Sequence, residues 1–429
     1  MPEIAIACIV ITALMAYVNQ RFIGLPTTIG VMVVALLVSL GLIGLDRLGF
    51  STLHEYEKHL LGSINFSDLL MQGMLSMLLF AGALHIDLSK LRDYRWQVFG
   101  LAVMGTAAST VLIGAAVWWL LPWFGLSLGF AWCLVFGALI SPTDPIAVIG
   151  ILKSARAPDS VGVVVAGESL FNDGVGVVLF SVLAGIAVSG TTPDLGDTGM
   201  LFGREAGGGL LLGGAIGIVL FALLRSVDNY EVEVMLTLAA VLGGYELAHR
   251  LHVSGPLAMV VAGVAIGNHG RALAMSDTTR KHVDLFWKLL DQILNAVLFV
   301  LLGLELVLIA FSGKVFLASI GVILITLLVR LLTVGLPVAA LRRRFRLPAG
   351  SWKVLTWGGL RGGISVALAL SLPFGDNRDL ILSLTYAVVL FSILGQGLSI
   401  KWLIERELLA PQAAAGQPAG QATKSVDLT

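Results

Sequence analysis

The stretch Glu168-Ser169-Leu170-Phe171-Asn172-Asp173-Gly174 stands in the middle of a long apolar run. A second polar interruption, Ser141-Pro142-Thr143-Asp144-Pro145, stands in the apolar run before it. A charged side chain at the centre of a bilayer costs about 2.5–3.5 kcal/mol on insertion scales, and it normally lines a cavity or an ion path. Two carboxylates at matching depth on neighbouring membrane spans therefore indicate a cation or proton site.

The composition supports a membrane location. Of the 429 residues, 57% are hydrophobic and 13% are charged, and the mean hydropathy is +0.93. Soluble domains carry about 25% charged residues, so we predict an all-α polytopic protein surrounded by the lipid bilayer. The net charge of zero excludes a nucleic-acid partner recruited by overall basicity. The sequence indicates no cofactor.

Apolar stretches separated by short polar breaks predict about thirteen transmembrane helices in a single domain, residues 1–405. Residues 46–66 are expected to form an interfacial amphipathic segment, and residues 406–429 a short, disordered cytoplasmic tail. The expected spans are 3–19, 22–45, 67–88, 96–121, 127–152, 159–189, 205–227, 232–250, 255–268, 283–311, 316–339, 350–372 and 377–403.

The loops between these spans differ in charge. Sixteen Lys and Arg residues fall in the loops on one side of the membrane, and six fall on the other. Positively charged loops stay in the cytoplasm. The bias therefore predicts an N-terminus outside the cell and a C-terminus in the cytoplasm, and this alternation also requires an odd number of spans.

The fifth and twelfth spans each break near the middle. The fifth breaks at 141–145, where two prolines remove helix hydrogen bonds, and the twelfth breaks at Gly358-Gly359-Leu360-Arg361-Gly362-Gly363. Interrupted helices at equivalent places in two halves indicate an inverted-repeat transporter with a binding site at mid-membrane. Spans 1–6 would then pair with spans 8–13, with the seventh as a linker, and the two broken helices would cross.

The polar residues of the sixth span share one helix face with the break. Ser169 and Asp173 are four residues apart and stack on one stripe, with Asn172 beside them. Together with Asp144 and the freed carbonyl groups of the broken helix, they form a set of hard oxygen ligands suited to small cations. Because burial disfavours the charged form of a carboxylate, such a group can hold either a proton or a cation. Mutual exclusion between the two is the minimum that exchange requires.

Two arginines also stand at membrane depth, Arg330 in the eleventh span and Arg361 in the twelfth. A buried guanidinium needs a carboxylate or carbonyl oxygens. We expect Glu168 to pair with Arg330 and the freed carbonyls to bind Arg361, although either arginine could be the partner of Glu168. Asp291 and Asn295 form a further polar stripe in the tenth span, either as packing contacts or as part of the site.

Three of these motifs together resemble the cation:proton antiporter-1 family, the NhaP/NHE type of sodium/proton exchanger. They are residues 141–145, the sequence Gly-Glu-Ser-Leu-Phe-Asn-Asp-Gly at 167–174, and residues 358–363. The resemblance extends over residues 1–405 in one order. It implies a thirteen-helix inverted-repeat fold, a homodimer, and a core domain that moves against a dimerisation domain.

The resemblance also implies roles for the site residues. Asp173 is the principal carboxylate that binds the transported cation or the proton. Asp144, Ser169 and the carbonyl group of Thr143 help to coordinate the monovalent cation. Asn172 stands where the electrogenic relatives carry the first of two aspartates, which implies electroneutral exchange of one cation for one proton.

The implied function is secondary transport of Na⁺, or of Li⁺ or K⁺, against H⁺, with a role in pH and sodium homeostasis. Residues 79–83 lack the acidic residue that some archaeal members carry in the third span, and the large regulatory tail of animal exchangers is missing. We therefore expect a bacterial member of the family in the plasma membrane. Because the implied function is transport, we do not expect an enzyme. The alternatives are a cation channel and an intramembrane aspartyl protease, although the motifs of such a protease surround neither Asp144 nor Asp173.

Overall fold

The computed structural model describes residues 2–47, 74–190, 195–305 and 312–410, and these residues form helices joined by turns. The longer helices are α1 (Pro2–Val18), α2 (Thr27–Arg47), α5 (Leu75–Leu84), α8 (Thr106–Leu120), α9 (Phe130–Ile140), α10 (Ile146–Ser154), α11 (Asp159–Ser189), α12 (Leu195–Arg225), α13 (Tyr230–Leu251), α14 (Gly255–Ala265), α16 (Asp277–Glu305), α17 (Gly313–Arg330), α20 (Gly363–Leu370), α21 (Asp376–Phe391) and α22 (Gly397–Ile404). Shorter helices and π-helical turns are η1 (Asn19–Ile23), α6 (Leu88–Asp93), α7 (Arg95–Phe99), η3 (Gly100–Gly105), η4 (Leu121–Phe124), η5 (Ile266–Gly270), α15 (Arg271–Leu273), η7 (Leu331–Gly335), α18 (Leu336–Leu341), α19 (Ser351–Trp357), η8 (Ser392–Gln396) and η9 (Glu405–Leu409).

The all-helical membrane class predicted from the sequence is confirmed. Seven of the described helices are long and apolar enough to cross a membrane, and the number is eight if the bent pair α1 and α2 forms one span. Each of the expected spans falls, over its described part, on one helix, on consecutive helical segments or on two helix halves. The helix boundaries differ from the expected ones by a few residues, as is usual where helix ends fray.

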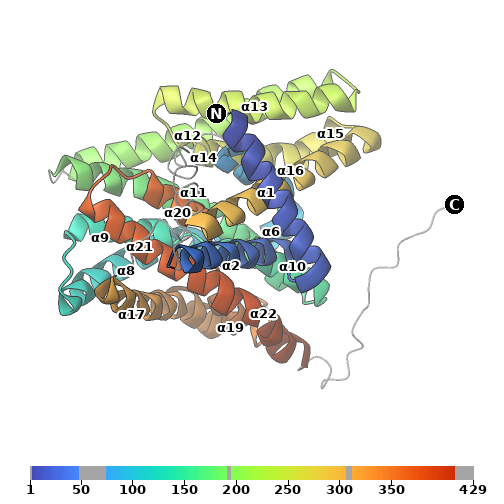
Figure 1. Cartoon of the computed structure of the whole chain (residues 1–429). Helices are drawn as coiled ribbons and strands as arrows, with labels where there is room; N and C mark the ends of the chain where they lie inside the picture. Colours follow the sequence, from blue (N-terminus) through green and yellow to red (C-terminus); the bar gives the residue numbers. More distant parts are fainter. Residues whose placement is uncertain (1, 48–73, 191–194, 306–311, 411–429) are drawn as a thin grey trace.

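The helices lie in two groups on either side of α11 (Figure 1). Helices α12 and α13 run together along one face of the molecule and pack on α14, while α8, α17 and α19 cover the opposite face. Helix α11 lies between the two groups, with α9 and α20 beside it. Helix α11, which has polar residues near its middle, is therefore enclosed by other helices. Its polar groups are kept away from lipid.

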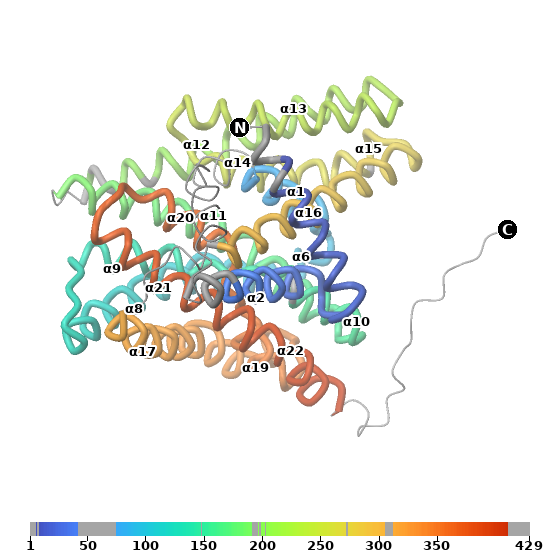
Figure 2. Tube along the Cα trace, in the orientation of Figure 1, coloured from blue at the N-terminus to red at the C-terminus, as the bar shows by residue number. Residues whose placement is uncertain are grey.

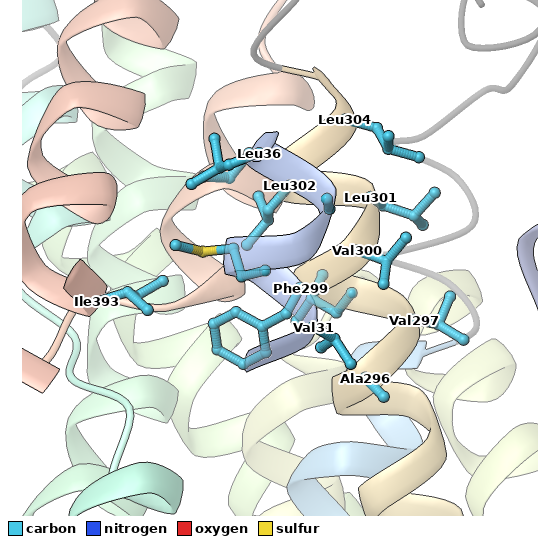
Figure 3. Close-up of a cluster of buried hydrophobic side chains, with 14 of the residues drawn as sticks. Val31, Leu36, Ala296, Val297, Phe299, Val300, Leu301, Leu302, Leu304 and Ile393 are labelled. Atoms are coloured by element: carbon cyan, nitrogen blue, oxygen red, sulfur yellow. The ribbon is translucent and has the colours of Figure 1, made fainter. Parts of the chain in front are cut away.

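Helices α2 and α16 pack closely along their length (Figure 2). Figure 3 shows Val31 and Leu36 of α2 facing the apolar half of α16, with Ile393 of η8 at the edge of the cluster. Lipid chains are as apolar as these side chains, so close van der Waals packing holds the pair together. The same cluster of buried side chains includes Val366, Ala367 and Leu370 of α20, so the α2–α16 pair packs against this half of the broken helix.

The structure departs from the sequence-based expectations at two places. Helices α1 and α2 meet at 103° across a short break, so the first two spans form a sharp corner. At the other end, the last helix continues to Leu409, beyond the expected start of a disordered tail at residue 406. Leu408 is buried, and Glu407 pairs with Lys353 at 2.8 Å, which explains why this part is ordered. The expected interfacial segment 46–66, after its first two residues, lies outside the described residues.

Candidate cation and proton site

The two interrupted helices cross at their breaks. Residues 141–145 separate α9 from α10, and residues 358–362 separate α19 from α20. The amide nitrogen of Asp144 donates a hydrogen bond of 2.8 Å to the carbonyl oxygen of Leu360, which makes an isolated antiparallel bridge. Peptide groups freed by one break are thus satisfied by the other. The crossing predicted from the sequence is confirmed.

Helix α11 lies against the two breaks and contributes two polar side chains to the site, Ser169 and Asn172. The Asn172 amide donates to Thr143 Oγ1 at 2.9 Å, and its carbonyl oxygen accepts from the Thr143 amide nitrogen at 3.3 Å. The Ser169 and Thr143 hydroxyl oxygens are 3.0 Å apart. The structure therefore brings Thr143, Asn172 and Ser169 into one hydrogen-bonded group, joining α11 to the first break.

Asp173 lies on the same helix, one turn beyond Ser169. The residue is 6% exposed, and its carboxylate accepts no hydrogen bond among the described residues. The negative charges of Asp144 and Glu168 are near enough to act on it. Buried polar groups are normally hydrogen-bonded, so this carboxylate is an exception that a bound proton or cation would satisfy.

Asp144 has both a structural and an electrostatic role. One carboxylate oxygen, Oδ1, accepts a hydrogen bond of 2.9 Å from the amide nitrogen of Ile146, the first residue of α10. The carboxylate also lies within the electrostatic reach of Asp173. Because a carboxylate has two oxygens, the geometry permits this helix-end hydrogen bond and cation binding at the same time.

Glu168 forms a buried ion pair with Arg330 of α17. The two guanidinium nitrogens donate to the two carboxylate oxygens at 2.7 and 2.8 Å. Asn172 adds a third hydrogen bond to Glu168 at 2.9 Å, and Arg330 also reaches the Leu355 carbonyl oxygen at 3.3 Å. Arg330 Nε is buried and has no hydrogen-bond partner among the described residues, but both terminal guanidinium nitrogens and both carboxylate oxygens are bonded. A bidentate pair of this kind is the geometry in which a buried ion pair is tolerated. It ties α11 to α17 and α19 directly behind the site.

Arg361 occupies a different position from Arg330. Its guanidinium donates to the carbonyl oxygens of Ser141 and Pro142 at 2.9 and 3.1 Å. These carbonyls are at the C-terminal end of α9, where the helix dipole is negative. Arg361 therefore stabilises the first break from the second, and of the two arginines considered from the sequence, Arg330 is the one that pairs with Glu168.

The glycines of the second break permit close approach. A Cβ atom on Gly362 would lie 2.7 Å from Asp144 Oδ2, and one on Gly359 would lie 2.8 Å from Arg330 Cζ. Real side chains do not come so close without displacing their neighbours. The paired glycines thus leave room for the carboxylate on one side and the guanidinium on the other.

Two polar residues that sequence reasoning missed support the second break. Ser392 Oγ accepts from the Arg361 amide nitrogen at 2.8 Å, and Gln396 Nε2 donates to the Trp357 carbonyl oxygen at 2.9 Å. Both are buried on η8. Ser392 and Gln396 are four residues apart in the apolar run 380–404 and so share one helix face, and this spacing could have indicated a polar contact there.

The Asp291–Asn295 stripe, which the sequence left open, lies next to the site. The Asn295 amide donates to Asp291 Oδ1 at 3.0 Å. Asp291 is partly exposed, Asn295 is buried, and the charges of Asp291 and Asp144 are near enough to interact. Helix α16 therefore places a third, partly exposed carboxylate near the crossing.

Comparison with known proteins identifies the family. The profile described as sodium/hydrogen exchanger, transmembrane, matches residues 9–406. The chain is 53% identical to the Na⁺/H⁺ antiporter NhaP of Pseudomonas aeruginosa over 423 residues, covering 97% of this chain and 98% of that one.

The chain belongs to the sodium/hydrogen exchanger family. It is also 36% identical to the Na⁺/H⁺ antiporter NhaH of Halobacillus dabanensis, covering 86% of this chain and 90% of that one. Among solved structures, the sodium proton antiporter MjNhaP1 of Methanocaldococcus jannaschii superposes with a TM-score of 0.72 at 19% identity, over 95% of this chain and 98% of that one. This likeness confirms the expected antiporter fold, and membership of an exchanger family makes the protein a transporter and not an enzyme.

Proposed function

We propose that this protein exchanges one Na⁺ for one H⁺ by alternating access, with Asp173 as the shared binding group. The observation that carries the proposal is the buried Asp173 carboxylate, which has no hydrogen-bond donor among the described residues. An isolated buried charge is very costly, so the group needs a proton or a cation. The names of the antiporter relatives favour Na⁺ as that cation, with Li⁺ or K⁺ as other candidates.

The cation would be held by oxygen atoms from both interrupted and continuous helices. Asp173 and Asp144 supply carboxylates, Ser169 a hydroxyl and Thr143 its carbonyl group. Such ligands suit hard monovalent ions. Asn172 contributes no charge and instead holds Thr143 in position through the hydrogen bonds described above.

Charge balance follows from the number of titrating groups. Glu168 is committed to Arg330 by two hydrogen bonds, and Asn172 is an amide. In this scheme Asp144 keeps its charge throughout the cycle, and Asp173 alone changes between the protonated and the cation-bound form. Each cycle then moves one positive charge in each direction. Exchange is then electroneutral.

The sixteen-to-six bias in loop charge supports a C-terminus in the cytoplasm and an N-terminus outside.

The movement proposed for alternating access takes place between the two helix groups. The group around the crossing, residues 95–189 and 313–404, would form the core, and α12 and α13 would belong to a dimerisation domain of a homodimer. The crossing itself is internally bonded through Asp144, Leu360 and Arg361, which supports its movement as a unit. The plasma membrane and a role in pH and sodium homeostasis are the setting that we propose.

Asp291 would assist the reaction without being the carrier. It is partly exposed and electrostatically close to Asp144. A carboxylate in this position raises the local concentration of cations at the entrance of the site. Asn295 orients it through the 3.0 Å hydrogen bond.

The test is exchange in proteoliposomes with a preset pH gradient. Adding Na⁺ to the wild-type protein should dissipate the gradient, with Li⁺ and K⁺ measured in parallel, and an imposed membrane voltage should leave the rate unchanged. Asp173→Asn should insert normally and lose exchange. No dissipation by any of the three cations would refute exchange, whereas a voltage-dependent rate would refute only the one-to-one stoichiometry.

A further inference from the structure

An apolar groove lies on the surface of the core, away from the crossing. It has a volume of about 430 Å³ and lies between α7, η3 and α8 on one side and η7 and α18 on the other. Figure 1 shows α8 and α17, which leads into η7, on the same face of the molecule. The lining is mostly apolar and includes Trp96, Met104, Leu112, Leu332, Leu341 and Phe345. The volume falls in the range of about 300–1,000 Å³ typical of small-molecule sites.

One end of this groove carries a concentration of positive charge. Arg342, Arg343 and Arg344 follow the lining residue Leu341 directly and are exposed. On the other wall, the guanidinium of Arg95 lies over the ring of Trp96, with Cζ 5.6 Å from the ring centroid. No carboxylate of the described residues forms an ion pair with these four arginines.

The surrounding sequence does not neutralise this charge. Residues 88–105 and 331–350, which include most of the lining and the chain next to it, contain seven Lys and Arg residues and one acidic residue, Asp93. Unpaired arginines bind phosphate groups with their planar, forked donors. An apolar groove with a cationic end is thus complementary to an amphiphile that has a hydrocarbon chain and an anionic phosphate head.

We propose that this groove binds an anionic phospholipid, with one acyl chain in the groove and the phosphate group held by Arg342, Arg343, Arg344 and Arg95. Basic pockets between membrane helices are known to take anionic lipid head groups. An acidic peptide would pair with the arginines but would leave the apolar groove empty. The combination of both features therefore favours lipid.

Lipid bound here would connect two parts of the core. Thr333 of η7 and Ser109 of α8 are joined by a hydrogen bond of 3.0 Å beside the groove. The η7 turn begins at the residue after Arg330, the partner of Glu168. An acyl chain between the two walls would add contacts to this junction, so binding should stabilise the protein, because a ligand specific for the folded state raises its stability.

The experiment compares two lipids on the purified full chain in a neutral detergent. Phosphatidylglycerol and phosphatidylcholine with identical acyl chains are titrated, and bound lipid is counted by native mass spectrometry while thermal unfolding is followed. Phosphatidylglycerol should bind more tightly and raise the unfolding midpoint more than phosphatidylcholine. Glycerol phosphate, which has the head chemistry without acyl chains, should produce no shift at the same concentration.

Two sets of variants locate the site. Replacing Arg342, Arg343 and Arg344 together with Gln should weaken binding of phosphatidylglycerol by about tenfold or more. The control removes three exposed positive charges elsewhere on the side that we assign to the cytoplasm, by the combined replacement of Arg225, Arg280 and Lys281 with Gln, and should bind as the wild type does.

The second variant, Ala108→Trp, fills the groove from an exposed lining position, and its control is Ala222→Trp at an exposed position on α12. Only the first should lose the preference for phosphatidylglycerol. The proposal is overturned by equal binding of the two lipids, by equal losses in the two triple variants, by wild-type binding in Ala108→Trp, or by a full shift with glycerol phosphate alone.

Discussion

Asn172 links the two functions of helix α11 at the scale of a single residue. Its amide nitrogen donates to Thr143 in the site and to Glu168 in the ion pair behind it. An aspartate has no such donor when ionised, and it would put a second negative charge beside Glu168. The amide therefore holds the site in shape and leaves Asp173 as its main titrating group.

The buried pair of Glu168 and Arg330 should behave as one unit in stability measurements. Removing either partner leaves an uncompensated buried charge, so Glu168→Gln and Arg330→Ala should each destabilise the protein by about 3–5 kcal/mol. The double variant should cost clearly less than the sum of the two. Thermal unfolding in detergent measures this, and Arg250→Ala, which breaks the exposed pair with Glu246, should cost under about 1 kcal/mol. Additive losses would mean that the pair is not coupled.

Asp291 is expected to act on cation capture and not on the exchange step. Asp291→Asn should raise the KM for Na⁺ several-fold and leave kcat close to that of the wild type, because it removes a charge at the entrance and leaves the carrier intact. Initial rates of exchange against Na⁺ concentration provide the measurement. Asp277→Asn, at an exposed position on the same helix, is the control. A loss of kcat with KM unchanged would contradict the role proposed for Asp291.

At the scale of helices, the crossing of α9–α10 with α19–α20 depends on space as well as on hydrogen bonds. Gly362→Ala should separate the two breaks, since its Cβ would lie 2.7 Å from Asp144 Oδ2, and exchange should fall strongly. Gly185→Ala in α11 meets no atom within 4 Å and should be neutral or slightly stabilising, because alanine favours helices by about 1 kcal/mol over glycine. Exchange in proteoliposomes and thermal unfolding distinguish the two. Normal exchange in Gly362→Ala would show that the close approach is unnecessary.

Much of this arrangement could be predicted from the sequence, because the membrane restricts the possible structures. Apolar runs of the right length indicated the helices, and prolines and glycines within two of them indicated the breaks. The pair of Glu168 and Arg330 was expected from the sequence, but only the three-dimensional structure distinguishes it from a pair with Arg361, since both arginines stand at similar depth. The supporting positions of Ser392 and Gln396 were missed for the same reason: a polar residue in an apolar helix does not reveal which neighbour it faces.

At the scale of the whole molecule, one shared carboxylate predicts competition between the two ions. As the pH falls, protons occupy the site and the apparent KM for Na⁺ should rise, approaching about tenfold per pH unit, because one proton displaces one cation. As the pH rises, the KM should reach a constant value. The measurement is exchange at several pH values, set equal on both sides of the membrane. A KM that does not change with pH would mean that protons and cations bind independently.

If Asp173 holds either a proton or a cation, cation binding must release a proton, and this release can be measured without transport. Purified protein in a weakly buffered, mildly acidic solution is mixed with Na⁺, and the pH is recorded, with choline as the control cation. We expect release of about one proton per chain at saturation from the wild-type protein and from Asp291→Asn, and none from Asp173→Asn. Equal release from Asp173→Asn and the wild type would contradict the role proposed for Asp173.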